Sequence, residues 1–275
     1  MSGAVPAGID YGFKLSGSTG KGVLLIHGLT GAPAEMKYLA RRLHRRGFSV
    51  HAPQLAGHCQ DYAALLRTTW HDWLASVEAA HAALRADVDE VYAAGICVGG
   101  ALGLALAAKQ RALKAAAVYS MTFRYDGWNM RRWYDAAARL LEPFANLPGV
   151  RRFSVGEPYP YGLKDERLRG AVEQSQGGLI EGALDRLPFG ALYQMHRLAR
   201  HVERVGAGVT QPVLLLHSRE DDMSHPRNAE RLRAALAGPV DLRLVEDSYH
   251  MLHVDKQRNL VADWTARFFG AGEPA

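Results

Sequence analysis

The sequence predicts an α/β protein built on a doubly wound, mostly parallel sheet. Short apolar runs suited to buried strands alternate with longer segments whose apolar residues recur at helical spacing. Two of the runs, residues 23–26 and 213–216, contain only apolar residues, as expected of strands that are covered on both faces. In doubly wound sheets, ligands bind over the carboxyl ends of the strands.

The composition is that of an ordinary soluble protein. The chain has 275 residues, of which 48% are hydrophobic and 22% charged, with a formal net charge of +5. It shows no run long enough to span a membrane and no signal peptide, so we expect a cytoplasmic protein. Scattered basic residues argue against a nucleic-acid partner. Because no metal-ligand cluster and no nucleotide fingerprint is found, we expect neither metal nor cofactor. The oligomeric state stays open.

The first 120 residues are predicted to supply the first half of the sheet. The first helix has Met36, Leu39 and Leu43 on one face, and Gly47 ends it. The third helix is rich in Ala and Leu and contains no proline. Strands are predicted over residues 11–16, 23–26, 48–52, 90–96 and 115–120, and helices over 35–46, 70–84 and 101–110.

Residues 121–209 break this alternation and are predicted to form a helical cap, or lid, inserted into the sheet domain. They are too rich in aromatic and apolar side chains for a disordered loop. Residues 1–120 and 210–275 would then form the core. Helical patches in the cap cover residues 128–141, 165–174 and 192–205. After the cap, strands are predicted over residues 212–218 and 240–245, and helices over 226–237 and 254–269.

The stretch Gly95-Ile96-Cys97-Val98-Gly99-Gly100 joins a predicted strand to a predicted helix. A strand, a nucleophile flanked by glycines and a helix are the parts of a nucleophile elbow. The glycines two residues before and after Cys97 let strand and helix approach, and the turn points the nucleophile at the helix N-terminus. A buried cysteine is more often a small core residue. The predicted strand before Cys97, the predicted helix after it, and an acid and a histidine later in the chain favour the catalytic interpretation.

A thiol nucleophile needs a base, and the base needs an acid that orients it. In chains with such an elbow, the acid and then the histidine follow the nucleophile at later strand ends. Asp221 lies after the strand 212–218 and His250 after the strand 240–245, so we assign both, with Cys97, to a catalytic triad. Asp222 is the alternative acid, and His253 is the alternative base.

These motifs resemble those of α/β-hydrolases, in particular small bacterial carboxylesterases and monoacylglycerol lipases. The resemblance implies an α/β-hydrolase fold and covers nearly the whole core. In this family Ser usually stands at the position of Cys97, and Gly at that of Cys59. The box 95–100 is also similar to the Cys-containing box of polyhydroxyalkanoate synthases. The matching segments are His27-Gly28-Leu29-Thr30-Gly31, residues 52–58, Asp72-Trp73, Asp221 with Pro226, and Ser248-Tyr249-His250 with Val254-Asp255.

An oxyanion hole needs two backbone N–H groups fixed where negative charge develops. Elbow geometry assigns one to Val98, the residue after the nucleophile. The family resemblance implies that the other comes from Leu29. His27 is expected to support its loop, and His58 is either a loop support or a pocket residue. Cys59 is expected to be incidental, although its loop could bring it near the site.

A histidine and a helix N-terminus can lower the pKa of a thiol greatly. We expect Cys97 to attack an acyl carbonyl and form a thioester, which a water activated by His250 then hydrolyses. The predicted activity is hydrolysis of small-molecule carboxylic esters or thioesters with an apolar acyl group. Because thioesters also pass acyl groups to other acceptors, an acyltransferase is one alternative. A non-catalytic binding protein on the same fold is the other.

Overall fold

Seven strands form the central sheet, in the order β1-β3-β2-β4-β5-β8-β9. The computed structural model describes residues 9–130, 140, 142–145, 147–174 and 180–270. β1 runs antiparallel to β3, and every other pair of neighbours in this sheet is parallel. The strands are β1 (Phe13–Leu15), β2 (Lys21–Ile26), β3 (Ser49–Ala52), β4 (Glu90–Ile96), β5 (Ala116–Tyr119), β8 (Val213–Ser218) and β9 (Val240–Val245).

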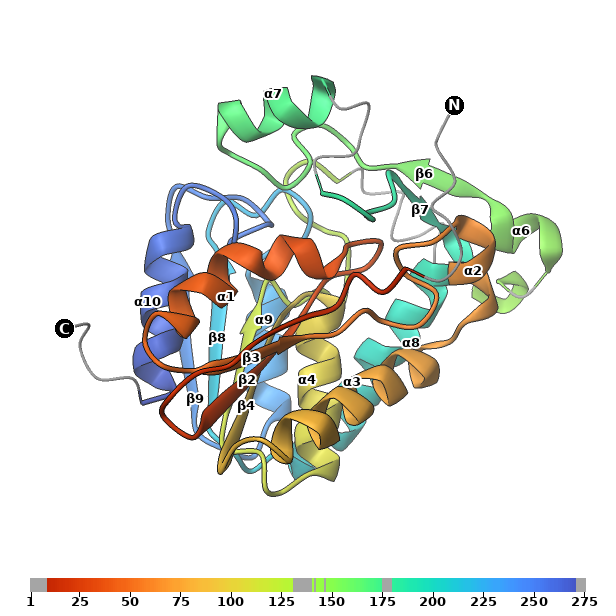
Figure 1. Ribbon diagram of the computed structural model, residues 1–275. Coiled ribbons are helices and arrows are strands. Elements are labelled where there is room, and N and C mark those ends of the chain that lie inside the picture. Colours follow the sequence, from red (N-terminus) through yellow and green to blue (C-terminus); the bar gives the residue numbers. More distant parts are fainter. Residues whose placement is uncertain (1–8, 131–139, 141, 146, 175–179, 271–275) are drawn as a thin grey trace.

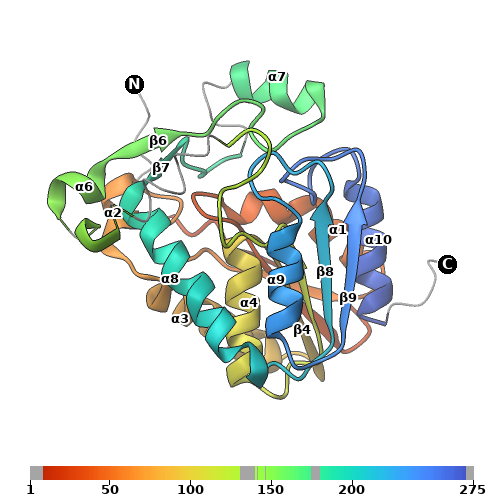
Figure 2. The same cartoon turned by 180° about the vertical axis from the view of Figure 1, so that it is seen from behind.

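Helices cover both faces of the sheet, which confirms the predicted doubly wound α/β fold (Figures 1 and 2). One face carries α1 (Lys37–His44) and α10 (Arg258–Phe268), which contact each other. The other face carries α3 (Trp70–Arg85), α4 (Val98–Lys109), α8 (Phe189–Val205) and α9 (Arg227–Ala235). Among the described residues, no helix is both long and apolar enough to cross a membrane.

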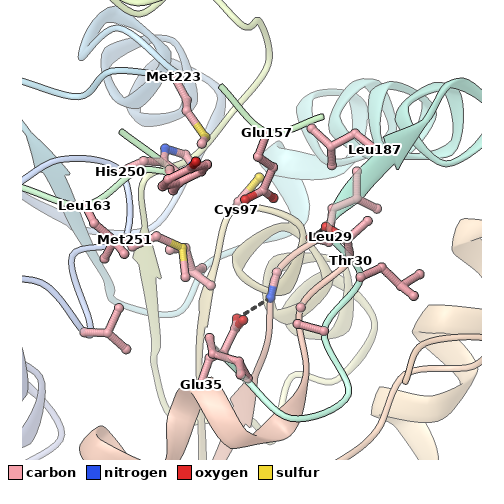
Figure 3. Close-up of a pocket in the computed structure, with 18 of the residues that line it drawn as sticks. Leu29, Thr30, Glu35, Cys97, Glu157, Leu163, Leu187, Met223, His250 and Met251 are labelled. Carbon is pink, nitrogen blue, oxygen red and sulfur yellow. Dashed lines mark hydrogen bonds between the residues drawn. The ribbon is translucent and has the colours of Figure 1, made fainter. Parts of the chain in front are cut away.

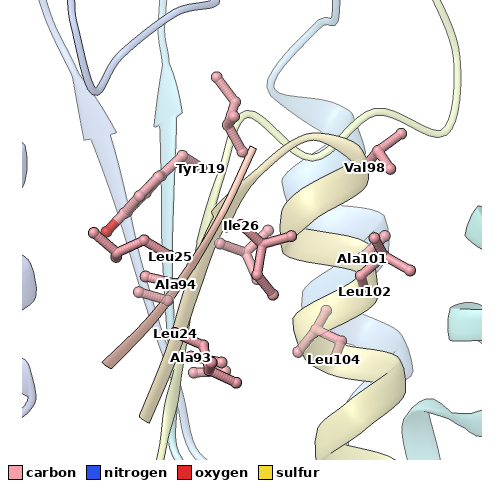
Figure 4. Close-up of a cluster of buried hydrophobic side chains, with 14 of the residues drawn as sticks. Leu24, Leu25, Ile26, Ala93, Ala94, Val98, Ala101, Leu102, Leu104 and Tyr119 are labelled. Carbon is pink, nitrogen blue, oxygen red and sulfur yellow. The ribbon is translucent and has the colours of Figure 1, made fainter. Parts of the chain in front are cut away.

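The middle of the sheet forms a dry core against α4 (Figure 4). Leu24, Leu25 and Ile26 of β2 are completely buried. Their neighbours on β4, Ala93 and Ala94, are small. Every residue of α4 from 98 to 107 is buried, because the sheet lies on one side of the helix and α8 on another. The helix that starts at the elbow therefore rests on a closely packed support, which fixes the position of the elbow.

Several elements begin or end differently from the prediction. α4 starts at Val98 instead of residue 101, because packing against the sheet overrides the low helix propensity of Gly99 and Gly100. α10 starts at Arg258 instead of residue 254. The short helix α2 (Tyr62–Arg67) was not predicted. It is capped by Asp61, whose Oδ1 accepts the N–H of Ala64 at 2.6 Å.

Before residue 189, most described residues of the inserted segment lie above the carboxyl ends of the strands, whereas α8 lies along one face of the sheet (Figures 1 and 2). α7 (Glu166–Gln174) matches a predicted helix, and α8 starts three residues before its predicted start at Leu192 and packs along α4. The predicted helix 128–141 falls mostly outside the described residues. An antiparallel ribbon of β6 (Ser154–Gly156) and β7 (Arg186–Pro188) was not predicted, because each strand is only three residues long. Short helical segments are α6 (Pro148–Arg152), η1 (Pro33–Met36), η2 (Glu142–Phe144) and η3 (Gly206–Gly208).

Candidate active site

Cys97 occupies a sharp turn between β4 and α4. Its φ of 50° and ψ of −110° lie outside the regions that non-glycine residues prefer, as expected of a nucleophile elbow. The N–H of Cys97 donates to the carbonyl of Tyr119 at 2.9 Å. A Cβ on Gly95 would overlap the backbone of Gly99, and one on Gly99 would overlap the carbonyl of Ile26. The glycines therefore have the role that the sequence predicts: they let strand and helix meet.

The loops after β8 and β9 bring an acid and a histidine to Cys97. Nδ1 of His250 donates to Oδ2 of Asp221 at 2.9 Å and lies 3.1 Å from Oδ1. The Asp221 carboxylate also accepts the N–H groups of Met223 and Ser224, at 2.9 and 2.7 Å. His250 and Cys97 line one cavity (Figure 3). The three residues assigned from the sequence thus lie in one connected cluster.

The acid and the histidine are a charged pair. Burial by itself would lower the pKa of His250, but the Asp221 carboxylate and hydrogen bonds to Asp221 and Cys97 raise it well above the usual value. Burial would raise the pKa of Asp221, but the charge of His250 and its hydrogen bond hold that pKa below the usual range. The result is a buried imidazolium at the cavity that Cys97 also lines.

The alternative residues make other contacts. The carboxylate of Asp222 accepts the backbone N–H of His250 at 3.3 Å, whereas its neighbour Asp221 accepts from the imidazole. His253 is buried, and neither of its ring nitrogens has a hydrogen-bond partner among the described residues. Burial and, to a lesser extent, the charge of His250 lower the pKa of His253 to about 3, so His253 is neutral. His217, which had no assigned role, places Nε2 3.3 Å from Oδ2 of Asp221.

Two different segments carry the expected oxyanion donors, Leu29 and Val98. Leu29 lines the cavity from the loop after β2. Val98 is the first residue of α4, where backbone N–H groups have no partner within the helix. Thr30, next to Leu29, has a φ of 60°, and its carbonyl accepts the N–H of Leu184 at 2.8 Å. The inserted segment is therefore bonded directly to the loop of Leu29.

His27 and His58 support loops and do not line this cavity. Nε2 of His27 accepts the N–H of Leu55 at 3.3 Å, and the rings of His27 and His58 meet edge to face at 5.0 Å. Burial lowers the pKa of His27 to about 3 and that of His58 to about 4, so both are neutral. Cys59, with a φ of 59°, is buried next to Gly182 and also lies away from the cavity lining.

The cavity has a volume of about 120 Å³ and a mainly apolar lining (Figure 3). Three polar side chains that the sequence did not single out, Glu35, Glu157 and Tyr125, also line it. Burial raises the pKa of Glu35 and of Glu157 to about 7. The inserted residues that line the cavity are Tyr125, Glu157, Tyr161, Leu163, Val172, Ile180, Ala183, Leu184 and Leu187. In the part of the chain that is described, no group of three or more His, Cys, Asp or Glu could hold a metal ion.

Sequence comparisons place the chain among known hydrolases. A family model described as "Serine aminopeptidase, S33" matches residues 17–257. The chain is 27% identical over 249 residues to a thermostable monoacylglycerol lipase of Bacillus sp. (strain H-257), with 90% of each chain covered. It is 24% identical over 246 residues to a carboxylesterase of Bacillus subtilis (strain 168), covering 88% of this chain and 89% of the relative.

Solved structures agree with this assignment of the fold. A structure from work on LipS and LipT, two metagenome-derived lipolytic enzymes, superposes with a TM-score of 0.79 at 25% identity, covering 97% of this chain and 98% of the other. The monoacylglycerol lipase of Paleococcus ferrophilus superposes with a TM-score of 0.76 at 17% identity, covering 95% and 98%. The second likeness concerns the fold alone.

Proposed function

Because the chain belongs to the α/β-hydrolase family described as serine aminopeptidase, S33, we propose that it hydrolyses small esters through a covalent acyl-Cys97 intermediate. The observation that carries the proposal is the cluster at the elbow. Cys97 stands in the strained turn and lines one cavity with His250, whose Nδ1 lies 2.9 Å from Oδ2 of Asp221. Relatives of this chain are named a monoacylglycerol lipase and a carboxylesterase, which supports ester hydrolysis.

In the acylation step, the sulfur of Cys97 attacks the acyl carbonyl and forms the C–S bond. The electron pair of the carbonyl moves to oxygen, where the N–H groups of Leu29 and Val98 stabilise the negative charge. The oxyanion then collapses, the bond to the leaving group breaks, and the leaving alcohol or thiol takes a proton from His250. Asp221 holds the imidazolium in the orientation that this transfer needs.

In the deacylation step, His250 is neutral and takes a proton from a water that attacks the thioester carbon. A second oxyanion forms at the same two N–H groups. The C–S bond then breaks, the carboxylic acid leaves, and the proton on His250 restores the starting pair with Cys97. The net reaction consumes one water for each ester or thioester cleaved.

The substrate class follows from the lining of the cavity. Leu163, Leu187 and Met251 supply apolar surface close to Cys97 (Figure 3). Such walls bind a hydrocarbon acyl group better than a charged one. We therefore propose esters and thioesters of apolar acids as substrates, with residues 121–209 acting as the lid that forms one side of the acyl pocket.

The proposal is tested by turnover of p-nitrophenyl esters and acyl-CoA thioesters of graded chain length, combined with intact-mass spectrometry. Wild-type protein quenched during turnover should carry the mass of one acyl group, mapped to Cys97. Cys97→Ala should carry none and should lose about 10³-fold or more in kcat. Full esterase activity in Cys97→Ala would rule out the acyl-Cys97 mechanism. Absence of any turnover or acylation in the wild-type protein would favour a non-catalytic binding protein.

A second candidate is acyl transfer, which the thiol nucleophile favours. A thioester intermediate passes its acyl group readily to alcohols, thiols or amines, and the box 95–100 resembles that of polyhydroxyalkanoate synthases. Product analysis with and without an added alcohol or thiol acceptor distinguishes the two reactions. If the acceptor diverts most of the product from free acid to acylated acceptor, the chain is a transferase; if free acid dominates, it is a hydrolase.

A further inference from the structure

Glu35 lies directly behind the loop that carries Leu29. Its Oε1 accepts the N–H of Gly28 at 2.7 Å, the contact drawn as a dashed line in Figure 3. The backbone N–H of Glu35 itself donates to the carbonyl of Ala32 at 3.0 Å. Only 2% of the Glu35 side chain is exposed. One buried carboxyl group therefore holds the start of the loop 28–32.

The loop is shaped to this carboxyl group. A Cβ on Gly31 would collide with Oε2 of Glu35, although Gly31 itself does not have a positive φ. An alanine at this position would thus be tolerated by the backbone and excluded only by the carboxyl group. The missing Cβ of Gly31 therefore makes room for the Glu35 carboxyl group. Replacing Gly31 by alanine would displace this carboxyl group while Glu35 itself stays in the chain.

The groups around Glu35 are a neutral histidine, a cysteine, a second buried carboxyl group and the imidazolium of His250. Nε2 of His253 lies 3.9 Å from Oε1, and His253 is neutral. The charge of Glu35 contributes to the raised pKa of Cys59. The charge of Glu157, in the inserted segment, contributes to the raised pKa of Glu35. Burial is the main reason that the pKa of Glu35 rises to about 7; its bonds to Gly28 and Ala32 and the attraction of His250 lower it less.

Resting on the function proposed above, we propose that Glu35 is a positioning residue for the oxyanion hole and that its neutral form supports turnover. A neutral carboxyl group still accepts the N–H of Gly28 through its carbonyl oxygen and so fixes Leu29. An ionised carboxylate would add a negative charge behind the loop where the reacting carbonyl oxygen becomes negative. Because like charges repel, ionisation of Glu35 should destabilise the oxyanion and slow turnover.

The test compares Glu35→Gln with wild type across the pH range, because glutamine has the shape of the neutral acid and does not ionise. The ratio of kcat in Glu35→Gln to kcat in wild type should rise as pH passes about 7, by about tenfold in total, because only the wild-type carboxyl group then becomes negative. The change should lie in kcat and not in KM. Glu203→Gln, which removes a surface carboxylate paired with Arg231, is the matched control and should give a flat ratio.

Glu35→Ala and Gly31→Ala test the support of the loop separately. Each should lower kcat at every pH, by about 10- to 100-fold, as expected when an oxyanion donor is displaced. Folding is checked by thermal unfolding of each variant. A flat or falling Glu35→Gln ratio, or an unchanged kcat in Gly31→Ala, overturns the inference while Cys97→Ala is still inactive. Full activity in Cys97→Ala overturns the proposed function instead.

Discussion

Gly162 donates its N–H to Oδ2 of Asp222 at 3.1 Å, and this bond joins the inserted segment to the acid loop. The other oxygen of Asp222 accepts the backbone N–H of His250. The adjacent Asp221 instead accepts from the imidazole of His250. Two neighbouring aspartates therefore contact the same residue in different ways: one orients its ring, and the other holds its backbone against the insertion.

Exchanging each aspartate for asparagine separates the two contacts. Asp221→Asn removes the charge that stabilises the imidazolium and should lower kcat by about 10³- to 10⁴-fold, as in triads generally. Asp222→Asn keeps one oxygen acceptor and should lower kcat by about tenfold or less. Steady-state kinetics of both variants on one ester measures the difference. The reverse order of effects would assign the acid role to Asp222.

Asp255 fastens the His250 loop to the inserted segment and is fully buried. Its carboxylate accepts the N–H groups of Tyr249, Lys164 and Asp165, at 2.7, 3.0 and 2.8 Å. Asp255→Ala would leave these donors without a protein partner, and each buried unsatisfied group costs about 1–3 kcal/mol. We expect the free energy of unfolding to fall by about 2–5 kcal/mol, measured by urea denaturation.

The matched control for this prediction is Asp241→Ala. The carboxylate of Asp241 pairs with Arg243, and both side chains are more than a third exposed, so its loss should change the free energy of unfolding by less than about 1 kcal/mol. Similar losses in the two variants would contradict the role that the buried hydrogen bonds give to Asp255.

Glu157 should make stability depend on pH. Burial raises its pKa from about 4.5 to about 7, so the folded protein keeps this proton at pH values where the unfolded chain has lost it. The wild-type protein therefore loses stability as pH rises between these two values. Glu157→Gln does not ionise. Relative to wild type, its free energy of unfolding should rise by up to about 3 kcal/mol between about pH 4.5 and pH 8.

Urea denaturation at the two pH values measures this effect, with Glu203→Gln as the control. In Glu203, the bond to Arg231 lowers the pKa of the carboxyl group, so its replacement should not stabilise the protein as pH rises. A difference between Glu157→Gln and wild type that stays constant with pH would show that Glu157 is ionised equally in the folded and unfolded chains.

The fold could be predicted from the sequence because its signals are local. The apolar runs of β2 and β8 and the glycines around Cys97 each identify an element or turn without knowledge of the others. The order of nucleophile, acid and histidine then assigns each to a strand end. The spacing to Pro226 already favoured Asp221 over Asp222, and the structure places the Asp221 carboxylate against the imidazole of His250 and that of Asp222 against the backbone.

Glu35 shows what the sequence could not reveal. At the start of a predicted helix, a glutamate is typical of an acid that interacts with the helix dipole at the surface. Its burial depends on how the loop 28–32 folds back over it. Glu157 precedes a proline and reads only as part of a turn. Glu157 reaches the cavity through contacts between segments far apart in the chain, which periodicity and spacing do not encode.

The two cysteines should differ sharply in reactivity. Cys97 lines the cavity together with His250, whereas Cys59 is 1% exposed and does not line it. Burial, followed by the charges of Glu35 and Asp10, raises the pKa of Cys59 to about 12. Iodoacetamide at neutral pH should therefore alkylate Cys97 about 100-fold faster or more, as followed by peptide mass spectrometry. Esterase activity should fall in step with modification of Cys97, and Cys59→Ala should keep both the rate of inactivation and the activity. If alkylation of Cys59 is what abolishes turnover, the nucleophile is not the residue at the elbow.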